Sequence, residues 1–487
     1  GPHGLAARGP AQRVFRAAVV IDVGRRRQRS AGDREIHGVG LEFERIVRGP
    51  GKVAEDVVEQ LSVAGQRQRG FRITVLIQHA EEVVDHAVAR DERQPVDHVG
   101  EPIPVDGKDT AAGERVAGRG ADPVKIGMVT YLSTKAGYLG EDIRDGMLLA
   151  IQQWDGTLGG LPVELIVEDD GRDPEKGRQI AERFIQRDGV KLMTGIVFSN
   201  VAMAVVPKVV RDDVIYLSPN AGPSALAGKG CSENYFNVAW QNDNLHEVTG
   251  QYVTDSGFGK VYMLAPNYPA GKDALAGFKR YYKGQVAGEV YTKLGQSDYA
   301  AELAALRAAG PDAVFFFLPG GMGINFIKQY SQAGLSGQIP LFGPAFSFDE
   351  RLLKAVGDSA VGVINGSQWN WDLDNPANAQ FVEAFRAQYQ RTPTLYASQG
   401  YDTARLIASA LAATGGDVSD LAAVRAALRK ADFESVRGSF RFGPNQHPVQ
   451  DLYVREVVAL EGGFTTNKTK AKVFSDHGDA YAADCKM

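Results

Sequence analysis

Two short polar clusters are the residues in this sequence that best suit the binding of a small anion. They are residues 198–200 (FSN) and residues 218–222 (SPNAG). A serine hydroxyl at a helix start can cap the helix and still contact a ligand, and the free N–H groups there attract negative charge. We therefore expect two halves of an anion site, one at Ser199 and the other at the backbone of Asn220, Ala221 and Gly222.

Buried strands must hold these clusters in place. Residues 191–197 and 214–217 are short apolar runs typical of buried parallel strands, and residues 202–210 have the pattern of a helix between them. In an open α/β sheet, ligands bind outside the carboxyl ends of the strands. The two clusters follow such ends, so we expect them to lie close together.

Strand and helix patterns alternate on both sides of this segment. Residues 124–217 give one series and residues 260–342 a second, with helices expected at 377–389, 398–414 and 421–430 and late strands at 438–442 and 452–458. Short connections between alternating strands and helices predict parallel, doubly wound sheets. The fold class is therefore α/β, with two Rossmann-like lobes.

Composition excludes several classes of protein. A chain of 487 residues is too long for one core, and its formal charge of −5 argues against nucleic-acid binding. No apolar run approaches the ~18 residues that a membrane span needs. The two cysteines, Cys231 and Cys485, lack the short spacing of a zinc site. They are either two unrelated buried thiols or one disulfide that holds the C-terminal tail, and we favour the disulfide, which implies an oxidising compartment.

The first 120 residues differ in composition from the rest. They contain no Tyr, Trp, Asn, Met or Cys, and Lys52 and Lys108 are their only lysines. A helix at 54–61 and a strand at 73–77 fit the pattern, but no regular alternation follows. We interpret residues 1–120 as a poorly packed extension, such as an upstream reading frame, with a small accessory domain as the alternative. Five histidines there fit no metal site, and we find no secretory leader just before Ala121.

Enzyme motifs are missing from the sequence. The glycines at 320–323 lack the spacing of a dinucleotide or phosphate loop, and neither G-x-S-x-G nor H-E-x-x-H occurs. Ser199 has no evident general base, because His246, His447 and His477 are the only histidines after Ala121. We therefore expect no catalysis and no cofactor.

From Ala121 onward the chain resembles the periplasmic solute-binding proteins of the Leu/Ile/Val-binding type, the receptors of ABC importers. The resemblance rests on four stretches in order: VKIGMVT…GYLGEDIRDGMLLAIQQ, VEDDGRDPEKG, GIVFSN…YLSPNAGPS and YASQGYDTARLIASAL. It implies two lobes joined by three crossings, near 238–241, 366–368 and 438–442. We place lobe 1 at 121–239 and 367–437, and lobe 2 at 240–366 and 438–487.

The departures from this family's amino-acid binders bear on the ligand. In those proteins a Ser and a Thr hold the α-carboxylate, and an acidic residue pairs with the ammonium. Here the Ser position matches Ser199, the Thr position falls on Gly222 and the acidic position falls near Ala345. A buried ammonium without a carboxylate would be costly. The resemblance therefore implies a site for a carboxylate that is not an amino acid.

Aromatic residues occur where the cleft is expected. They suggest an aromatic or aryl-aliphatic carboxylate, as in the branches of the family that import lignin-type acids. Beyond the anion site, the candidate ligand contacts are Tyr138, Tyr268, Phe346, Trp369, Trp371, Gln399 and Tyr401, with at most one of the two tryptophans in contact.

The resemblance implies a monomeric periplasmic receptor that works with an ABC permease in the inner membrane. Two alternatives stay open. The protein could bind branched-chain amino acids if Glu302 or Asp402 supplied the missing acidic partner. It could also be a ligand-sensing regulator of the same fold.

Overall fold

The computed structural model describes all residues except 1–16, 22–38, 44–122, 135 and 462–463. The chain divides into two units, Gly1–Gly113 and Glu114–Met487, and each is described by itself. In the first unit, β1 (Ala17–Ile21) pairs with β2 (Val39–Phe43) in antiparallel register. The helix expected at 54–61 and the strand expected at 73–77 lie outside the described residues. The interpretation of residues 1–120 as an extension stays a prediction.

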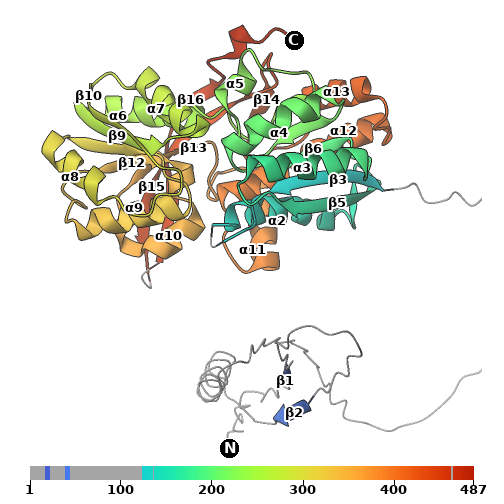
Figure 1. Cartoon of the computed structure of the whole chain (residues 1–487), viewed down its shortest axis with the longest axis horizontal. Coiled ribbons are helices and arrows are strands. Elements are labelled where there is room, and N and C mark those ends of the chain that lie inside the picture. The colour runs from blue at the N-terminus through green and yellow to red at the C-terminus, as the bar shows by residue number, and fades with distance from the viewer. Residues whose placement is uncertain (1–16, 22–38, 44–122, 135, 462–463) are drawn as a thin grey trace, which may run out of the picture. The chain divides into compact units, whose positions relative to one another are not determined.

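The second unit begins with a six-stranded sheet, the centre of the first lobe (Figure 1). Its strands are β3 (Val124–Thr130), β4 (Thr157–Leu158), β5 (Leu161–Asp169), β6 (Leu192–Thr194), β7 (Ile215–Ser218) and β8 (Tyr235–Asn237). They lie in the order β4-β5-β3-β6-β7-β8, and all but β4 are parallel to their neighbours. The order reverses between β3 and β6. This is the topological switch point, where doubly wound sheets bind ligands.

Helices cover this sheet. They are α2 (Tyr138–Gln153), α3 (Pro174–Gln186), α4 (Ser199–Arg211), α5 (Ser224–Ala227), α11 (Pro376–Tyr389), α12 (Leu395–Thr414) and α13 (Leu421–Lys430). α2 packs along α12, and α3 packs along α4 in front of the sheet in Figure 1. The start of α3 is fixed locally, because the Asp173 carboxylate accepts hydrogen bonds from two first-turn N–H groups and Pro174 suits the first helical position.

The second lobe is built on an eight-stranded sheet. Its strands are β9 (Lys260–Pro266), β10 (Gln285–Thr292), β11 (Ala313–Phe316), β12 (Leu341–Pro344), β13 (Ile364–Ser367), β14 (Phe440–Phe442), β15 (Pro448–Leu460) and β16 (Phe464–His477). The first five are parallel in the order β10-β9-β11-β12-β13, which repeats the switch point between β9 and β11. β15 then joins β13 in antiparallel register and pairs with β14 and β16, so this sheet is mixed.

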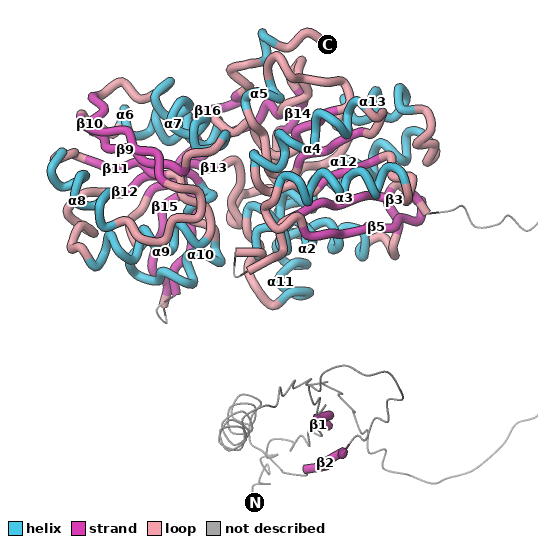
Figure 2. Tube along the Cα trace, viewed as in Figure 1, coloured by secondary structure: helices cyan, strands magenta, loops and turns pink. Residues whose placement is uncertain are grey.

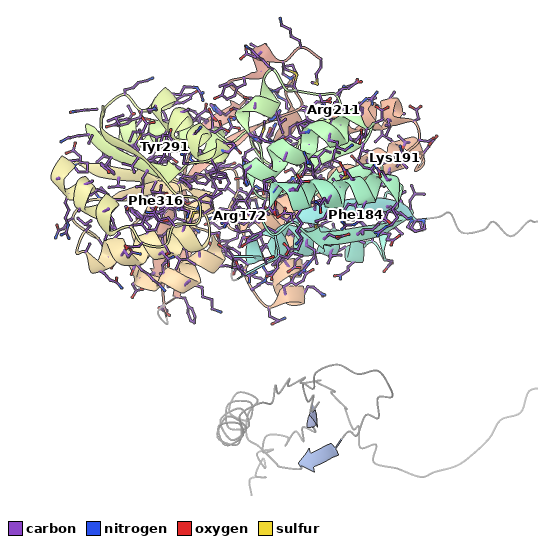
Figure 3. All side chains as sticks on the ribbon, viewed as in Figure 1. Arg172, Phe184, Lys191, Arg211, Tyr291 and Phe316 are labelled. Carbon is purple, nitrogen blue, oxygen red and sulfur yellow. A yellow bond between two sulfur atoms is a disulfide. The ribbon has the colours of Figure 1, made fainter. Side chains whose placement is uncertain are left out.

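The second lobe's own helices complete the unit. They are α6 (Asn244–Asp255), α7 (Pro269–Tyr281), α8 (Ala300–Ala309), α9 (Gly321–Gln332) and α10 (Glu350–Val356), with 3₁₀ turns η1 (Ala345–Ser347), η2 (Gly357–Ala360) and η3 (Ala482–Asp484). Figure 2 shows helices and strands alternating in both lobes. Phe184 is buried in the first lobe and Phe316 in the second (Figure 3). The predicted α/β fold of two doubly wound lobes is confirmed, while α6, α10 and β16 were not anticipated.

The chain crosses between the lobes three times, after β8, after β13 and before β14. The buried Arg437, just before β14, ties the third crossing to the first, since its Nη1 donates to the carbonyl of Ala239 (2.9 Å). Its Nε donates to Asp402 Oδ2 (3.1 Å) in α12 of the first lobe. The residue boundaries of the two lobes stay a prediction.

A disulfide joins Cys231, after α5, to Cys485, after η3. The predicted pairing of the two cysteines is confirmed, and the bond holds the C-terminal segment to the first lobe. In the part of the chain that the structure describes, no helix is long and apolar enough to cross a membrane.

Candidate functional site

A pocket lies between the two lobes, at the switch points of their sheets. Its cavity has a volume of about 30 Å³. Residues from both lobes and from the first crossing line it. They are Leu139, Val197, Phe198, Ser199, Asn220, Ala221, Trp240, Asn242, His246, Tyr268, Ala270, Phe317, Pro319, Phe346 and Tyr396.

Ser199 is the first residue of α4 and is buried. We expected its hydroxyl to cap this helix, and that expectation is wrong: Phe198 occupies the N-cap position, and no side chain caps the helix. The Ser199 hydroxyl instead accepts a hydrogen bond from Asn242 Nδ2 (3.1 Å). Among the described residues, no group accepts from the backbone N–H of Ser199 or Asn200. The start of α4 therefore leaves a hydroxyl and two N–H groups able to donate to an anion, and of these two residues Ser199 lines the pocket.

Asn242 connects the anion half of the pocket to the second lobe. Its Nδ2 also donates to Asp273 Oδ2 (2.9 Å), and its Oδ1 accepts from the backbone N–H of Gly222 (3.0 Å). Asp273, in α7, accepts from the Ser224 hydroxyl (2.6 Å) and backbone N–H (3.0 Å). Burial raises the pKa of Asp273 above its usual value. Asp273 does not line the pocket, but its carboxylate links α7 to Asn242 and Ser224 beside it.

The second polar cluster contributes less backbone than the sequence suggested. Asn220 and Ala221 line the pocket, but Gly222 does not. The N–H of Ala221 donates to Ile196 and that of Gly222 to Asn242, so both donors already have partners. Asn220 donates through Nδ2 to the carbonyl of Val197 (2.6 Å), while its Oδ1 has no partner among the described residues.

The rest of the pocket is an aromatic cage. Tyr268 and Phe346, both predicted, are brought together with Phe317, which lies 6.3 Å from Tyr268 and 5.6 Å from Phe346 between ring centroids. Trp240 meets Phe346 edge to face at 4.4 Å. Tyr396, from the first turn of α12, also lines this half. Such a cage suits a planar ring, because edge-to-face and offset contacts favour it.

His246, near the start of α6, is the one histidine among the described residues that line the pocket. Burial lowers its pKa to about 3, so the imidazole is neutral at physiological pH. Its ring lies 5.2 Å from Phe317 and 5.9 Å from Phe346 between centroids. The pocket lining within the described residues contains no Asp, Glu, Lys or Arg. The pocket is therefore polar at one end, apolar around the middle and free of fixed charge.

Tyr138, which we expect to contact the ligand, is not among the residues that line the pocket. Its hydroxyl donates to Asp349 Oδ2 (2.7 Å) across the two lobes, and the Arg351 guanidinium lies 4.8 Å above its ring. Arg351 also pairs with Asp142 (3.0 Å). Tyr138 thus belongs to a contact between α2 and the start of α10, beside the pocket.

Four other candidates also lie off the pocket lining. Trp369 is buried and donates through Nε1 to Asn378 Oδ1 (2.7 Å). Trp371 donates to the hydroxyl of Thr466 (3.1 Å). Gln399 is fully buried in α12, and neither of its amide atoms has a partner among the described residues. Tyr401, on the same helix, donates to Gln153 (2.7 Å).

Sequence reasoning missed the pocket roles of Trp240, Asn242, His246, Phe317 and Tyr396. Trp240 lies within residues 238–241 and Asn242 directly after them, and we assigned this range to a crossing without assigning any side chain there to the pocket. Phe317 directly follows β11, so the switch-point rule that located Ser199 would have found it. In the described part of the chain, no group of three or more His, Cys, Asp or Glu residues could hold a metal ion.

The fold and this interlobe pocket define a two-lobed solute-binding protein. Residues 123–463 match the model of the periplasmic binding protein family, and the chain belongs to that family. It is similar to Leu/Ile/Val-binding protein homolog 6 of Brucella melitensis biotype 1, with 28% identity over 368 residues that cover 74% of this chain and 93% of that relative.

Two solved structures from the same class are also similar. One is an ABC-transporter solute-binding protein of R. palustris in complex with benzoate, which is 32% identical, has a TM-score of 0.71 and covers 75% of this chain and 100% of that one. The other is a solute-binding protein of an ABC transporter from Rhodopseudomonas palustris BisB5 in complex with 3,4-dihydroxybenzoic acid. It is 29% identical, with a TM-score of 0.68, and covers 74% of this chain and 99% of that one.

Proposed function

We propose that this protein is the receptor of an ABC importer for a small aromatic carboxylate. The observation that carries the proposal is the lining of the interlobe pocket, which combines aromatic rings with uncharged polar groups and contains no Asp, Glu, Lys or Arg among the described residues. The solute-binding proteins solved with benzoate and with 3,4-dihydroxybenzoic acid support the same ligand class.

The carboxylate docks at the start of α4. There it accepts hydrogen bonds from the Ser199 hydroxyl and from the N–H groups of Ser199 and Asn200. These groups suit a carboxylate because a helix N-terminus carries a partial positive charge and its first N–H groups lack partners within the helix. Asn242 holds the Ser199 hydroxyl in place by donating to it.

The aromatic ring of the ligand then lies between Trp240, Tyr268, Phe317 and Phe346. Burial of a ring in such a cage is favourable, and aromatic contacts add ~0.5–1.5 kcal/mol beyond burial. Tyr268 and Phe346 belong to the second lobe and cover the ring when that lobe swings onto the first. Hinge closure of this kind needs only a few loop residues to change conformation.

An α-amino acid is a poorer ligand for the same pocket, although the similar Brucella protein is named as a Leu/Ile/Val-binding homolog. Its ammonium would be buried without a carboxylate in the lining. The two acidic residues considered as substitutes lie elsewhere: Asp402 pairs with Arg437 (3.1 Å), and Glu302 accepts from Gln296 (2.8 Å). Asp273 already accepts from Ser224 and Asn242.

The proposed receptor works outside the cytoplasm, in the periplasm, as a monomer that delivers its ligand to an ABC permease in the inner membrane. The Cys231–Cys485 disulfide supports an oxidising compartment. A ligand-sensing role for the same fold would instead require a signalling partner. A permease and an ATPase encoded beside this protein would favour transport, and a neighbouring transcriptional antiterminator would favour sensing.

Calorimetric titration of the full chain with benzoate, phenylacetate, leucine and valine tests the ligand class. We expect benzoate or phenylacetate to bind and to raise the melting temperature, because a ligand of the native state stabilises it. Binding of leucine or valine without binding of either aryl acid would overturn the proposal.

A further inference from the structure

His246 stands out in the pocket because it is the one histidine among the described residues that line it. The residue lies near the start of α6, on the second lobe, and only 1% of its surface is exposed. α6 packs against β12 and β13 of that lobe's sheet. The proposed carboxylate donors at Ser199 lie on the first lobe. His246 therefore faces the pocket from the lobe opposite the anion site.

Apolar rings surround this histidine. Phe317 lies 5.2 Å away, Phe315 5.7 Å and Phe346 5.9 Å between ring centroids. Nδ1 of His246 is buried and has no hydrogen-bond partner among the described residues. A buried polar atom without a partner is costly, and natural proteins rarely keep one without a reason. His246 is also one of the residues that line the pocket.

The imidazole is neutral, since burial lowers its pKa to about 3. A neutral imidazole offers one N–H donor and one acceptor nitrogen. It can therefore satisfy a hydroxyl group, which also donates and accepts, but it offers no charge to a carboxylate. A ligand whose carboxylate sits at the start of α4 would direct the far edge of its ring toward the second lobe.

We propose that His246 recognises a hydroxyl group on the ring of the bound acid, so that the pocket prefers hydroxybenzoates to benzoate. This inference rests on the proposed function and names the ligand more closely. A site built to hydrogen-bond a hydroxyl rejects the analogue that lacks it, because the buried polar group of the protein then stays unpaired. By the same reasoning, removing the imidazole should remove the preference.

The test is calorimetric titration of the full chain with benzoate, 3-hydroxybenzoate and 4-hydroxybenzoate, using the wild-type protein and His246→Phe. The Phe variant keeps a flat ring in the cage and removes both nitrogens. We expect the better of the two hydroxybenzoates to bind wild type roughly ten-fold more tightly than benzoate does. In His246→Phe we expect this ratio to fall to about one, with the affinity for benzoate kept or improved.

Phe317→Leu is the matched control, because it alters the cage beside the histidine without touching a polar group. It should weaken all three acids alike and leave the ratio intact. His246→Gln is a second variant, which should retain part of the preference for the hydroxybenzoate over benzoate. It replaces His246→Phe in the test if that variant does not fold.

The outcomes separate the two proposals. Equal affinity of wild type for benzoate and both hydroxybenzoates would overturn the role of His246 and leave the aryl-acid receptor standing. A preference that persists in His246→Phe would do the same. Failure of wild type to bind any of the three acids would overturn the proposed function and this inference together.

Discussion

The two lobes share a strand order but differ in the chemistry at their switch points. In the first lobe, the strand ends lead to Ser199 and Asn220, which offer a hydroxyl, an amide and free N–H groups. In the second lobe, the equivalent strands β11 and β12 lead to Phe317 and Phe346, and Tyr268 follows β9. The same backbone geometry thus presents a polar surface from one side and an aromatic surface from the other.

This difference explains how one pocket can hold a molecule with two unlike ends. The sheet topology decides where the ligand lies, because both switch points open toward the same cleft. The side chains placed at those points decide what the ligand is. Polar and aromatic surfaces that face each other favour a carboxylate attached to a ring over a uniformly polar or uniformly apolar solute.

The largest expected effect is the change of stability with pH that comes from Asp349, whose contact with Tyr138 joins the lobes beside the pocket. Burial raises the pKa of Asp349 to about 7, against the hydrogen bonds that Tyr138 and the backbone donate to it. Because this folded-state pKa lies above the ordinary aspartate value of 3.8, the stabilising contribution is complete below pH 3.8 and is lost as pH rises through about 7. Each pH unit inside that window removes up to about 1.4 kcal/mol.

Melting temperatures of wild type and Asp349→Asn between pH 5 and pH 8 measure this. Wild type should lose stability across the range, and the Asn variant, which cannot ionise, should lose less. Asp243 and Asp170 also have raised pKa values, to about 7 and about 6, so the informative quantity is the difference between the two proteins. Parallel curves would show that Asp349 is not the titrating group.

Much of the first lobe followed from the sequence, because its strands and helices have strong local patterns. Strands at 191–197 and 214–217 and a helix at 202–210 were predicted around the two polar clusters, and β6, β7 and α4 lie there. The second lobe was harder. β16 alternates weakly, and α6 directly follows a crossing whose aromatic residues masked its start.

The candidate site shows the same limit. Ser199, Asn220, Ala221, Tyr268 and Phe346 follow strand ends, so the switch-point rule located them. Tyr138 and Trp369 are aromatic residues of the kind that line clefts, but neither lines the pocket. Tyr138 bonds to Asp349 and Trp369 to Asn378 instead. Local patterns in the sequence do not predict a hydrogen-bond partner that lies far away along the chain.

Ser199→Ala should weaken ligand binding by removing the hydroxyl at the polar end of the pocket. Loss of a hydrogen bond to a charged group costs about 1.5–3 kcal/mol, so the affinity for benzoate should fall roughly 10- to 150-fold. Ser409→Ala, on the partly buried side of α12, removes a hydroxyl that bonds only within its own helix and should change little. Calorimetric titration of both variants decides the matter; similar affinities in the two would place the carboxylate elsewhere.

Phe346→Leu should weaken the binding of benzoate by less than Ser199→Ala does. Leucine keeps most of the buried apolar surface but loses the ring that meets Trp240 edge to face. The expected cost is about 0.5–1.5 kcal/mol, or roughly 2- to 12-fold in the affinity for benzoate. Acetate, which has a carboxylate and no ring, is the control ligand, and its weak affinity should not depend on residue 346. An unchanged affinity for benzoate would contradict the aromatic cage as the ring site.

The smallest expected effect concerns a charge outside the pocket. Arg172 lies where the lobes meet (Figure 3), with its guanidinium 5.6 Å from the ring centroid of Phe198, a residue that lines the pocket. Because no Asp, Glu, Lys or Arg lines the pocket among the described residues, this half-buried cation should attract the ligand only through long-range electrostatics. Arg172→Gln should therefore slow benzoate association about two- to three-fold at low salt, with a difference that shrinks as salt screens the charge.

Arg178→Gln, an equal charge change on the outer surface of α3 where Arg178 pairs with Glu175, is the matched control. Stopped-flow association rates at low and at physiological ionic strength distinguish the two variants. A large, salt-independent loss of affinity in Arg172→Gln would instead mean that the arginine contacts the bound carboxylate directly, and that the polar end of the pocket is not free of charge.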